Sequence, residues 1–371
     1  MKVGIPSEVK NNEFRVAITP AGVHELVRHG HEVYVQQGAG LGSSITDAEY
    51  VAAGGAILPT ADEVWAIADL LLKVKEPIEE EYHRLRKDQT LFTYLHLAAS
   101  RPCTDALIAS GTTAIAYETV ETADRRLPLL APMSEVAGRL APQVGAYHLM
   151  RAAGGRGVLP GGVPGVAAGK AVVIGGGVSG WNATQIAVGM GFHVTLLDRD
   201  INKLKEADKV FGTKVQTVVS NSFELERACL EADLVIGAVL IPGAKAPKLV
   251  TSELVSRMKP GSVLVDIAID QGGCFEDSHP TTHAEPTFQV HNSVFYCVAN
   301  MPGAVPNTST HALTNATLPY ILELADRGWA EALRRDAALA KGLNTHDGKV
   351  VYREVAEAHG LEHTELSALL G

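Results

Sequence analysis

Residues 170–180 read KAVVIGGGVSG, a short apolar run rich in β-branched residues that leads into a G-x-G-x-x-G turn. The residues that follow, Trp181–Met190, have the composition of a helix. This strand–turn–helix context is what gives the glycine motif meaning. Gly175 permits a tight turn, Gly177 lets the backbone approach a pyrophosphate, and Gly180 allows close packing of helix on strand. The segment therefore predicts a dinucleotide-binding βαβ unit.

An acidic residue at the end of the next predicted strand strengthens this interpretation. The strand covers His193–Leu197, and Asp198 follows it, 18 residues after Gly180. A carboxylate there would meet the ribose 2′-OH, which favours NAD over NADP, although Arg199 leaves some room for a 2′-phosphate. The alternative is a packing turn followed by an Asp that caps a helix. The strand, helix and acid occur in register, which favours the dinucleotide site.

The same region continues as an alternation of strands and helices. Strands are predicted at Val215–Val219, Asp233–Leu240, Ser262–Ile269 and Val294–Val298, with a helix at Ser222–Glu231. Continuous apolar runs indicate strands covered on both faces, as in parallel sheets. We therefore predict one doubly wound, NAD-binding domain over residues 129–306, with a Gly/Pro-rich connection or mobile loop at Gly154–Gly169.

The first 128 residues show a second α/β pattern, to which the end of the chain is expected to return. Helices are predicted at Pro20–His29 and after the capping-box sequence Thr46–Glu49, and strands at Lys2–Ile5, Glu32–Gln36, Leu70–Lys75, Thr90–Leu97 and Ala114–Val120. Residues 307–371 have a helical pattern (Leu313–Gly328, Glu331–Leu339, Val351–His359) that is too short for a core of its own. The predicted fold class is therefore α/β, with two Rossmann-like domains, doubly wound parallel sheets and a discontinuous substrate domain.

Composition excludes several classes of protein. The chain has 371 residues and a formal net charge of −10, and it has no Lys/Arg cluster longer than a pair, so nucleic-acid binding is not expected. It contains no run of 18 apolar residues and no signal-peptide pattern, so we expect no membrane segment. The four cysteines are far apart, which suits buried thiols in a reducing compartment. These features favour a cytoplasmic enzyme.

Charged residues stand at the ends of several predicted strands, where open α/β sheets bind their ligands. One candidate is His96. Periodicity cannot choose between Lys73 and Lys75, or between Asp266 and Asp270, because residues two or four apart share a strand face. Position favours the later member of each pair. A Lys, a His and an Asp beside a dinucleotide-binding domain indicate an active site rather than solvated turns.

The chain resembles a known family, the alanine dehydrogenases, over essentially its whole length. The resemblance is strongest to the actinobacterial, mycobacterial-type members. The motifs that carry the resemblance are GIP at 4–6, NNEFRV at 11–16, LLKVKEP at 71–77, TYLHLA at 93–98, APMSEVAG at 131–138, VDIAIDQGG at 265–273 and NMP at 300–302. The resemblance implies NAD-dependent oxidation of L-alanine to pyruvate and ammonia, and the reverse amination. It also implies glyoxylate amination as a second activity and a homohexameric assembly.

The resemblance assigns a role to each matching residue. Arg15 and Lys75 would bind the substrate, and Arg suits a carboxylate because it can donate two parallel hydrogen bonds. His96 and Asp270 would be the acid–base residues, and neutral His96 would take a proton from the attacking water. The implied cofactor contacts are Ser134, Gly175, Gly177, Gly180, Asp198, Lys203, Ser220, Val239, Leu240, Ile267, Asn300 and Met301.

One position departs from the family pattern. Family members can bind magnesium through an acid and a His four residues apart, but here Glu323 is followed by Arg327. A guanidinium has no lone pair with which to ligate a metal, so we expect an ion pair and no metal there.

Two other functions fit parts of this pattern. The first is the NAD-binding α subunit of a proton-translocating transhydrogenase, which shares the fold and the motif around Arg15. The second is a catalytically inactive NAD sensor. The joint presence of Lys75, His96 and Asp270 argues against both.

Overall fold

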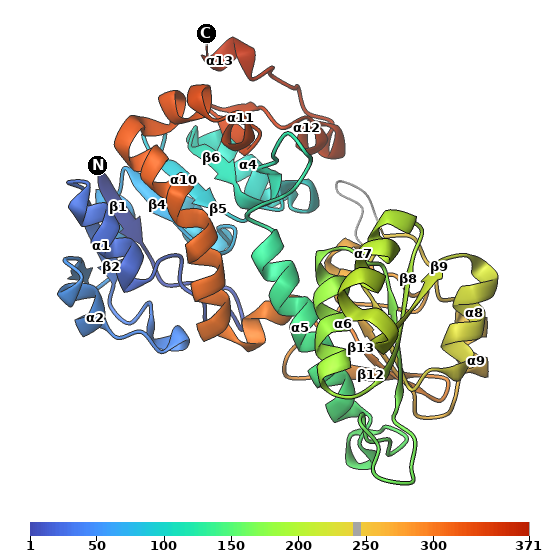
Figure 1. Cartoon of the computed structure of the whole chain (residues 1–371). Coiled ribbons are helices and arrows are strands. Elements are labelled where there is room, and N and C mark those ends of the chain that lie inside the picture. The colour runs from blue at the N-terminus through green and yellow to red at the C-terminus, as the bar shows by residue number, and fades with distance from the viewer. Residues whose placement is uncertain (240–245, 371) are drawn as a thin grey trace. The chain divides into compact units, whose positions relative to one another are not determined.

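The computed structural model describes residues 1–239 and 246–370 and divides into two compact units (Figure 1). Unit 1 comprises Met1–Met133 and the chain from Val305 onward, and unit 2 comprises Ser134–Ala304. The sequence placed these boundaries at 128/129 and 306/307. The chain leaves unit 1 and later returns to it, which is the discontinuous arrangement expected. No helix of the described residues is long and apolar enough to cross a bilayer.

Unit 2 is built on a seven-stranded sheet. Its strands are β7 (Lys170–Ile174), β8 (His193–Asp198), β9 (Val215–Val219), β10 (Leu234–Gly237), β11 (Val263–Asp266), β12 (Thr287–Val290) and β13 (Ser293–Tyr296). They lie in the order β12-β13-β11-β10-β7-β8-β9, and only β12 pairs antiparallel. The six parallel strands follow the 3-2-1-4-5-6 order of dinucleotide-binding sheets.

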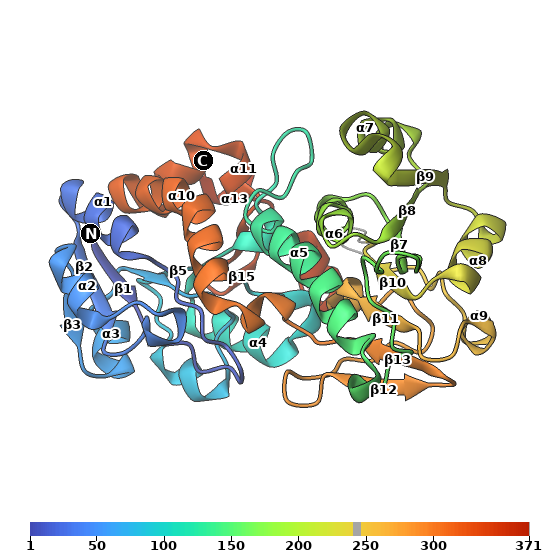
Figure 2. The same cartoon turned by 60° about the horizontal axis from the view of Figure 1, so that its bottom comes forward.

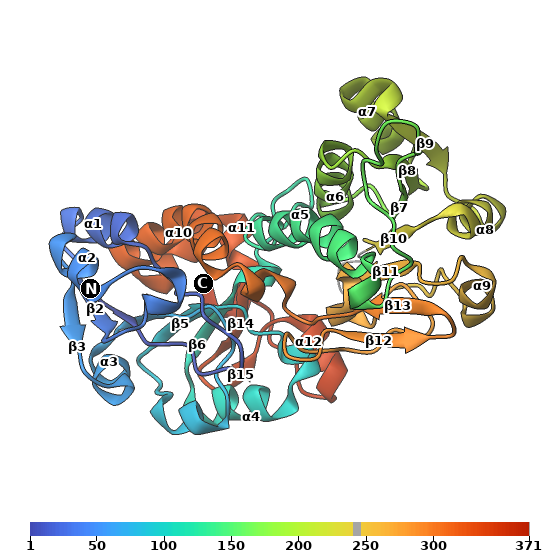
Figure 3. The same ribbon diagram turned by 90° about the horizontal axis from the view of Figure 1, so that it is seen from below.

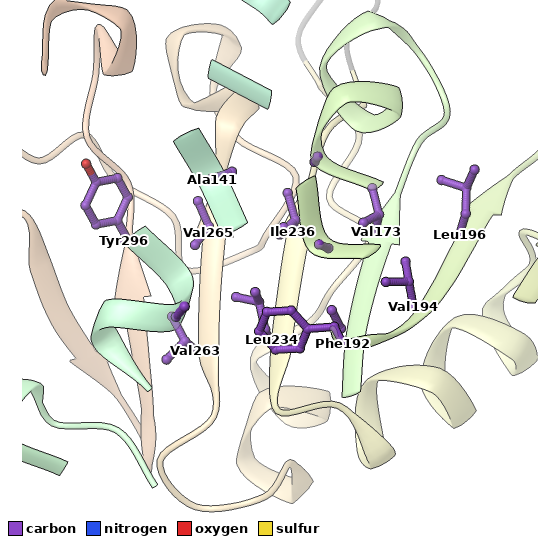
Figure 4. Close-up of a cluster of buried hydrophobic side chains, with 14 of the residues drawn as sticks. Ala141, Val173, Phe192, Val194, Leu196, Leu234, Ile236, Val263, Val265 and Tyr296 are labelled. Atoms are coloured by element: carbon purple, nitrogen blue, oxygen red, sulfur yellow. The ribbon is translucent and has the colours of Figure 1, made fainter. Parts of the chain in front are cut away.

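Helices cover both faces of this sheet, as Figure 3 shows. Helices α5 (Ala131–His148), α6 (Val178–Gly189) and α7 (Ile201–Phe211) contribute to one apolar cluster, and α8 (Ser222–Glu231) and α9 (Ser252–Arg257) to the other. Neighbouring strand residues alternate between the two clusters: Val173 lies in the first, drawn in Figure 4, and Val172 in the second. The prediction of strands buried on both faces is confirmed.

Unit 1 contains an eight-stranded sheet of the same design. Its strands are β1 (Lys2–Ile5), β2 (Glu32–Gln36), β3 (Ala56–Leu58), β4 (Leu70–Leu72), β5 (Thr90–Thr93), β6 (Thr113–Ala116), β14 (Leu343–His346) and β15 (Lys349–Val350). The order is β15-β14-β6-β5-β4-β1-β2-β3, in which β1 to β6 are mutually parallel and again follow 3-2-1-4-5-6. Both sheets therefore reverse their strand order once, between β1 and β4 in unit 1 and between β7 and β10 in unit 2.

Unit 1 also contains eight α-helices among the described residues. They are α1 (Pro20–Arg28), α2 (Asp47–Ala52), α3 (Ala61–Ile67), α4 (Arg101–Ser110), α10 (Pro306–Arg335), α11 (Ala337–Ala340), α12 (Arg353–His359) and α13 (Ser367–Leu370). Helices α3, α4 and α12 share one apolar cluster, whereas α10 packs beside α1 (Figure 2). The predicted capping box is present, since Thr46 and Glu49 exchange both hydrogen bonds at the start of α2.

The prediction of an all-helical C-terminal tail was wrong. Strands β14 and β15 extend the first sheet, and β14 pairs antiparallel with β6. Both strands are too short to show a periodicity, and β14 pairs with β6, more than 200 residues away, while β15 pairs with β14 itself. The predicted helix end at Gly328 is confirmed, because the backbone of α10 is non-helical at that residue (φ 73°, ψ 160°) and a second helical segment follows it. Strands β3 and β12, at or near sheet edges, were also missed.

Candidate active site

The site residues predicted in unit 1 follow three neighbouring strands. Arg15 lies between β1 and α1, Lys75 follows β4, and His96 follows β5. These strands are adjacent and parallel, so their carboxyl ends meet at one edge of the sheet, beside the β1/β4 reversal. Open α/β sheets bind their ligands at this kind of position.

Arg15 is held by a buried carboxylate two residues before it. Its Nε donates to Glu13 Oε1 at 2.6 Å, its Nη2 donates to Glu13 Oε2 at 2.5 Å, and its Nη1 lies 3.0 Å from Met133 Sδ. Burial acts to raise the pKa of Glu13, but Arg15 and the nearby Lys75 outweigh it and hold that pKa below its usual range. The bidentate pair fixes the plane of the guanidinium.

The structure separates the two lysines that periodicity left equivalent. Lys73 is fully buried, and its Nζ lies 3.2 Å from Glu8 Oε2 and 2.8 Å from Glu81 Oε1. Burial alone would lower its pKa, but the two carboxylates raise it, so Lys73 is a structural cation. Lys75 is partly exposed at the edge of the sheet and lies close enough to Glu13 to lower its pKa. Lys75 is therefore the better candidate to meet a ligand.

His96 has a backbone conformation that is uncommon outside glycine, with φ 48° and ψ 37°. The carboxylate of Glu118 accepts hydrogen bonds from the backbone N–H groups of Leu95, at 3.2 Å, and of His96, at 2.6 Å. The same carboxylate faces His96 Nδ1 at 3.9 Å, and the imidazole stacks on Tyr94 with ring centroids 5.9 Å apart. Glu118 and Tyr94 therefore contact the His96 residue, while its side chain stays 43 % exposed to solvent.

The glycine turn of unit 2 has the geometry that a phosphate cradle requires. Gly175 has φ 100°, and a Cβ on Gly180 would lie 1.7 Å from the Gly175 carbonyl oxygen. A Cβ on Gly177, in contrast, would meet nothing within 4 Å. Helix α6 begins here without a side-chain cap, so its first N–H groups and its positive dipole end face the turn. These features fit the pyrophosphate of a dinucleotide.

Asp198 is tied to this turn. Its Oδ2 accepts a hydrogen bond from Gly176 N–H at 2.6 Å and lies 3.3 Å from Lys203 Nζ, and its Oδ1 accepts from Asp200 N–H at 2.8 Å. The carboxylate at the end of β8 is therefore fixed beside the glycine backbone. This is the position from which an acid selects the ribose of NAD.

The other predicted cofactor residues also follow parallel strands. Ser220 follows β9, Val239 follows β10, Ile267 follows β11, and Asn300 and Met301 follow β13. Together with the glycine turn and Asp198, they place predicted contacts beyond all six parallel strands of unit 2.

Three of the predicted cofactor residues do not follow a described strand end. Lys203 lies in the first turn of α7, where it reaches back to Asp198. Ser134 lies in the first turns of α5. Leu240 lies outside the described residues.

The structure also distinguishes Asp266 from Asp270. Asp266 is fully buried, and its Oδ2 accepts hydrogen bonds from the N–H groups of Cys274, at 2.8 Å, and Phe275, at 3.2 Å, and from the Ser278 hydroxyl, at 2.5 Å. Burial nevertheless raises its pKa. Asp270 is exposed in the 3₁₀ turn that follows β11. Asp266 therefore shapes the loop, and Asp270 is the residue available to a ligand.

Sequence analysis gave no role to Glu8, Glu13 or Glu118, which position the residues it did single out. No local signal could have identified Glu8 and Glu118, because each binds backbone groups of a segment more than 20 residues away. Only Glu13 stands beside its partner in sequence.

The expected ion pair at the metal position of the family is present, with Arg327 Nε 2.7 Å from Glu323 Oε2. Among residues 1–239 and 246–370, no group of three or more His, Cys, Asp or Glu side chains is arranged to hold a metal ion.

The two sheets and the glycine turn define a Rossmann-type, nucleotide-binding oxidoreductase. The models of the alanine dehydrogenase/PNT N-terminal and C-terminal domains match residues 4–137 and 141–353. The chain belongs to this family. It is 68 % identical over 370 residues to an alanine dehydrogenase of Mycolicibacterium smegmatis, with 100 % of both chains covered.

Solved structures agree with this membership. An L-alanine dehydrogenase superposes with a TM-score of 0.95 at 51 % identity, covering 97 % of this chain and 99 % of the other. A transhydrogenase from Sinorhizobium meliloti superposes with a TM-score of 0.83 at 27 % identity, covering 95 % and 100 %.

Proposed function

We propose that the protein is an NAD-dependent L-alanine dehydrogenase, which converts alanine to pyruvate and ammonia and catalyses the reverse reductive amination. The observation that carries this proposal is the convergence of Arg15, Lys75 and His96 on the carboxyl ends of β1, β4 and β5. Two cations and an oriented imidazole at one sheet edge suit a small 2-oxo acid and its amine. The full-length identity to alanine dehydrogenases supports the same substrate.

Arg15 and Lys75 bind the substrate in this proposal, Lys75 from a partly exposed position and Arg15 from a buried one, where its side chain is 2 % exposed. Glu13 neutralises Arg15 and fixes its orientation, so Lys75 supplies the excess positive charge that attracts an anionic carboxylate. Lys75 also polarises the carbonyl of pyruvate in the aminating direction.

His96 and Asp270 transfer the protons. Glu118 lies 3.9 Å from His96 Nδ1, and the imidazole accepts the proton of the attacking water. Asp270, exposed after β11, is the second acid–base group. The cofactor, when bound, accepts the hydride from the alanine Cα.

The cofactor is NAD, and the residues of unit 2 fit it. The N–H groups that open α6 at Gly177 would hold the pyrophosphate, and Asp198 would accept hydrogen bonds from the ribose diol and repel a 2′-phosphate. Lys203, Ser220, Val239, Ile267, Asn300, Met301 and Ser134 complete the proposed contacts.

A homohexamer in the cytoplasm is the proposed assembly, with glyoxylate amination as a second activity. In support of an assembly, the stretch 147–166 exposes the large apolar side chains of Tyr147, Met150, Leu159, Val163 and Val166. Exposed apolar side chains concentrated in one short stretch are typical of a protein contact. Light scattering of the purified protein tests the proposed stoichiometry.

The transhydrogenase α subunit remains the second candidate, because a transhydrogenase shares the fold at 27 % identity. One assay separates the two. Purified protein is mixed with L-alanine and NAD at alkaline pH, and the absorbance of NADH is followed. We expect alanine-dependent NADH formation and little activity with glutamate. Transhydrogenation in the absence of any alanine turnover would reject the proposal.

A further inference from the structure

Glu8 lies at the centre of a buried network behind the proposed substrate site. Its Oε1 accepts a hydrogen bond from Val74 N–H at 2.6 Å. Its Oε2 accepts one from Lys75 N–H at 3.3 Å and lies 3.2 Å from Lys73 Nζ. The side chain of Glu8 is 2 % exposed, and that of Lys73 is fully buried. One carboxylate thus holds three consecutive residues of the segment that leaves β4.

These contacts lie where the pairing of β1 with β4 has ended. β1 pairs with β4 only at Val3–Leu70 and Gly4–Leu71, so beyond that point the N–H groups of the β4 segment have no ladder partner on the β1 side. On the other side, the β5 segment still contributes, since Thr93 Oγ1 donates to the Lys75 carbonyl at 3.1 Å. The backbone of Lys75 is therefore held through its N–H by Glu8 and through its carbonyl by Thr93.

A second buried carboxylate, that of Glu81, also contacts Lys73 and can be compared with Glu8. Glu81, also 2 % exposed, lies 2.8 Å from Lys73 Nζ through its Oε1, and its Oε2 accepts a hydrogen bond from the N–H of Ile78 at 3.1 Å. Two carboxylates face one buried cation, and burial raises the pKa of Glu8 despite Lys73. Glu8 and Glu81 therefore share the same electrostatic partner and differ in their contact with the backbone of Lys75.

We propose that Glu8 is a positioning residue for Lys75: its carboxylate takes the place of the absent β1 partner and so fixes the direction in which the Lys75 side chain leaves the sheet edge. The inference rests on the proposed role of Lys75 in substrate binding. In this proposal Glu8 acts on the substrate site through Lys75 and does not itself contact the substrate.

The test compares Glu8→Gln with the matched control Glu81→Gln in the full-length protein. Both substitutions remove one carboxylate from Lys73, but only Glu8→Gln removes an acceptor from the Val74–Lys75 backbone. A misplacement of about 1 Å can cost about 100-fold in rate, so we expect Glu8→Gln to lower kcat/KM for pyruvate about 10- to 100-fold, mainly through KM. Glu81→Gln should stay within about twofold of the parent, and the Kd of NADH should not change in either variant.

A double-mutant cycle distinguishes positioning from general damage. The apparent Kd of pyruvate is measured in the presence of NADH for Lys75→Met and for the Glu8→Gln/Lys75→Met double variant. If Glu8 acts through Lys75, adding Glu8→Gln to Lys75→Met changes this Kd by no more than about twofold. Full additivity of the two losses would overturn the inference.

Hydrogen exchange gives a readout that does not depend on activity. The amides of Val74 and Lys75 should exchange faster in Glu8→Gln than in Glu81→Gln or the parent. If Glu8→Gln does not fold, Glu8→Asp keeps the charge but withdraws the carboxylate, and the same increase in exchange and in KM is expected. Unchanged exchange and KM in an active Glu8 variant would reject the positioning role. An inactive parent protein with protected amides would instead reject the proposed function.

Discussion

Gly177 and Gly180, the second and third glycines of the cofactor motif, should respond in opposite ways to the same added methyl group. In Gly177→Ala, the new Cβ meets nothing within 4 Å, and the backbone at φ −73° and ψ −170° is extended and open to alanine. In Gly180→Ala, the Cβ would lie 1.7 Å from the carbonyl oxygen of Gly175, against about 3.4 Å for an ordinary contact. The first change should spare the fold, and the second should strain it.

The magnitudes follow from those distances. Gly180→Ala overpacks the α6–β7 contact, and its backbone oxygen cannot move aside, so we expect a loss of about 3 kcal/mol, the upper end for overpacking. For a unit of this size, that loss lowers Tm by about 6–12 °C. Gly177→Ala should change Tm little, because the loss of a favourable N-cap residue is offset by the lower entropy of the unfolded chain. A methyl group between the turn and the pyrophosphate should weaken NADH binding about 10- to 100-fold, equivalent to about 1.4–2.8 kcal/mol.

Calorimetry of the two proteins without cofactor gives Tm, and titration with NADH gives Kd. The pattern expected is a normal Tm with weak NADH binding for Gly177→Ala, and a lowered Tm for Gly180→Ala. Normal NADH affinity in a folded Gly177→Ala protein would refute the reasoning, because the pyrophosphate would then lie elsewhere.

Four further predictions concern single side chains. His96→Ala should reduce kcat about 10²–10⁴-fold while the Kd of NADH stays constant, and a variant with more than half of the parent's turnover would have no acid–base residue at this position. Asp198→Gly should shift the ratio of kcat/KM values for NAD and NADP toward NADP, and an unchanged ratio would assign cofactor selection to another residue. A chelator should leave turnover unchanged, because Arg327 pairs with Glu323 and repels a divalent cation, whereas a crystallographic metal ion on Glu323 would contradict this. Burial raises the pKa of Glu8 above its ordinary 4.5, so between the unfolded and the folded pKa the folded chain holds a proton that the unfolded chain has lost. The free energy of unfolding should therefore fall as pH rises from the unfolded to the folded pKa. Glu8→Gln should flatten the dependence of Tm on pH in this range, and an unchanged dependence would contradict the prediction.

Much of unit 2 could be predicted from local sequence. Strands β7 and β9 and helix α8 have the predicted bounds, and the glycine turn and Asp198 stand at adjacent strand ends as expected. The reason is that a βαβ unit is assembled from neighbouring residues: a buried strand, a turn that needs glycine, and a helix that starts where the strand stops. Helix α6, however, begins at Val178 rather than Trp181, because its first turn is part of the glycine motif.

The C-terminal tail shows where local pattern fails. The four residues of β14 have no distinctive alternation, and they become a strand because the edge of β6 is available to pair with them. A two-residue partner, β15, then pairs with β14. The Asp347-Gly348 turn between the two strands, with φ 47° and 77°, is a local hairpin signal, whereas the remote edge of β6 decides that this hairpin joins the sheet.

The chain's local order of apolar runs, glycines and acids was sufficient to establish the class of fold, the cofactor turn and the strand ends that carry ligand groups. It could not separate Lys73 from Lys75, or Asp266 from Asp270, because a period of two gives both members of each pair the same face. Folding separated them: Glu8 and Glu81 reach Lys73 from other parts of the chain, and the 274–278 loop encloses Asp266. Whether a charged side chain is buried in a structural contact or exposed to a ligand depends on the groups that folding brings around it. Those contacts join different segments of the chain, so the sequence of one segment does not reveal them.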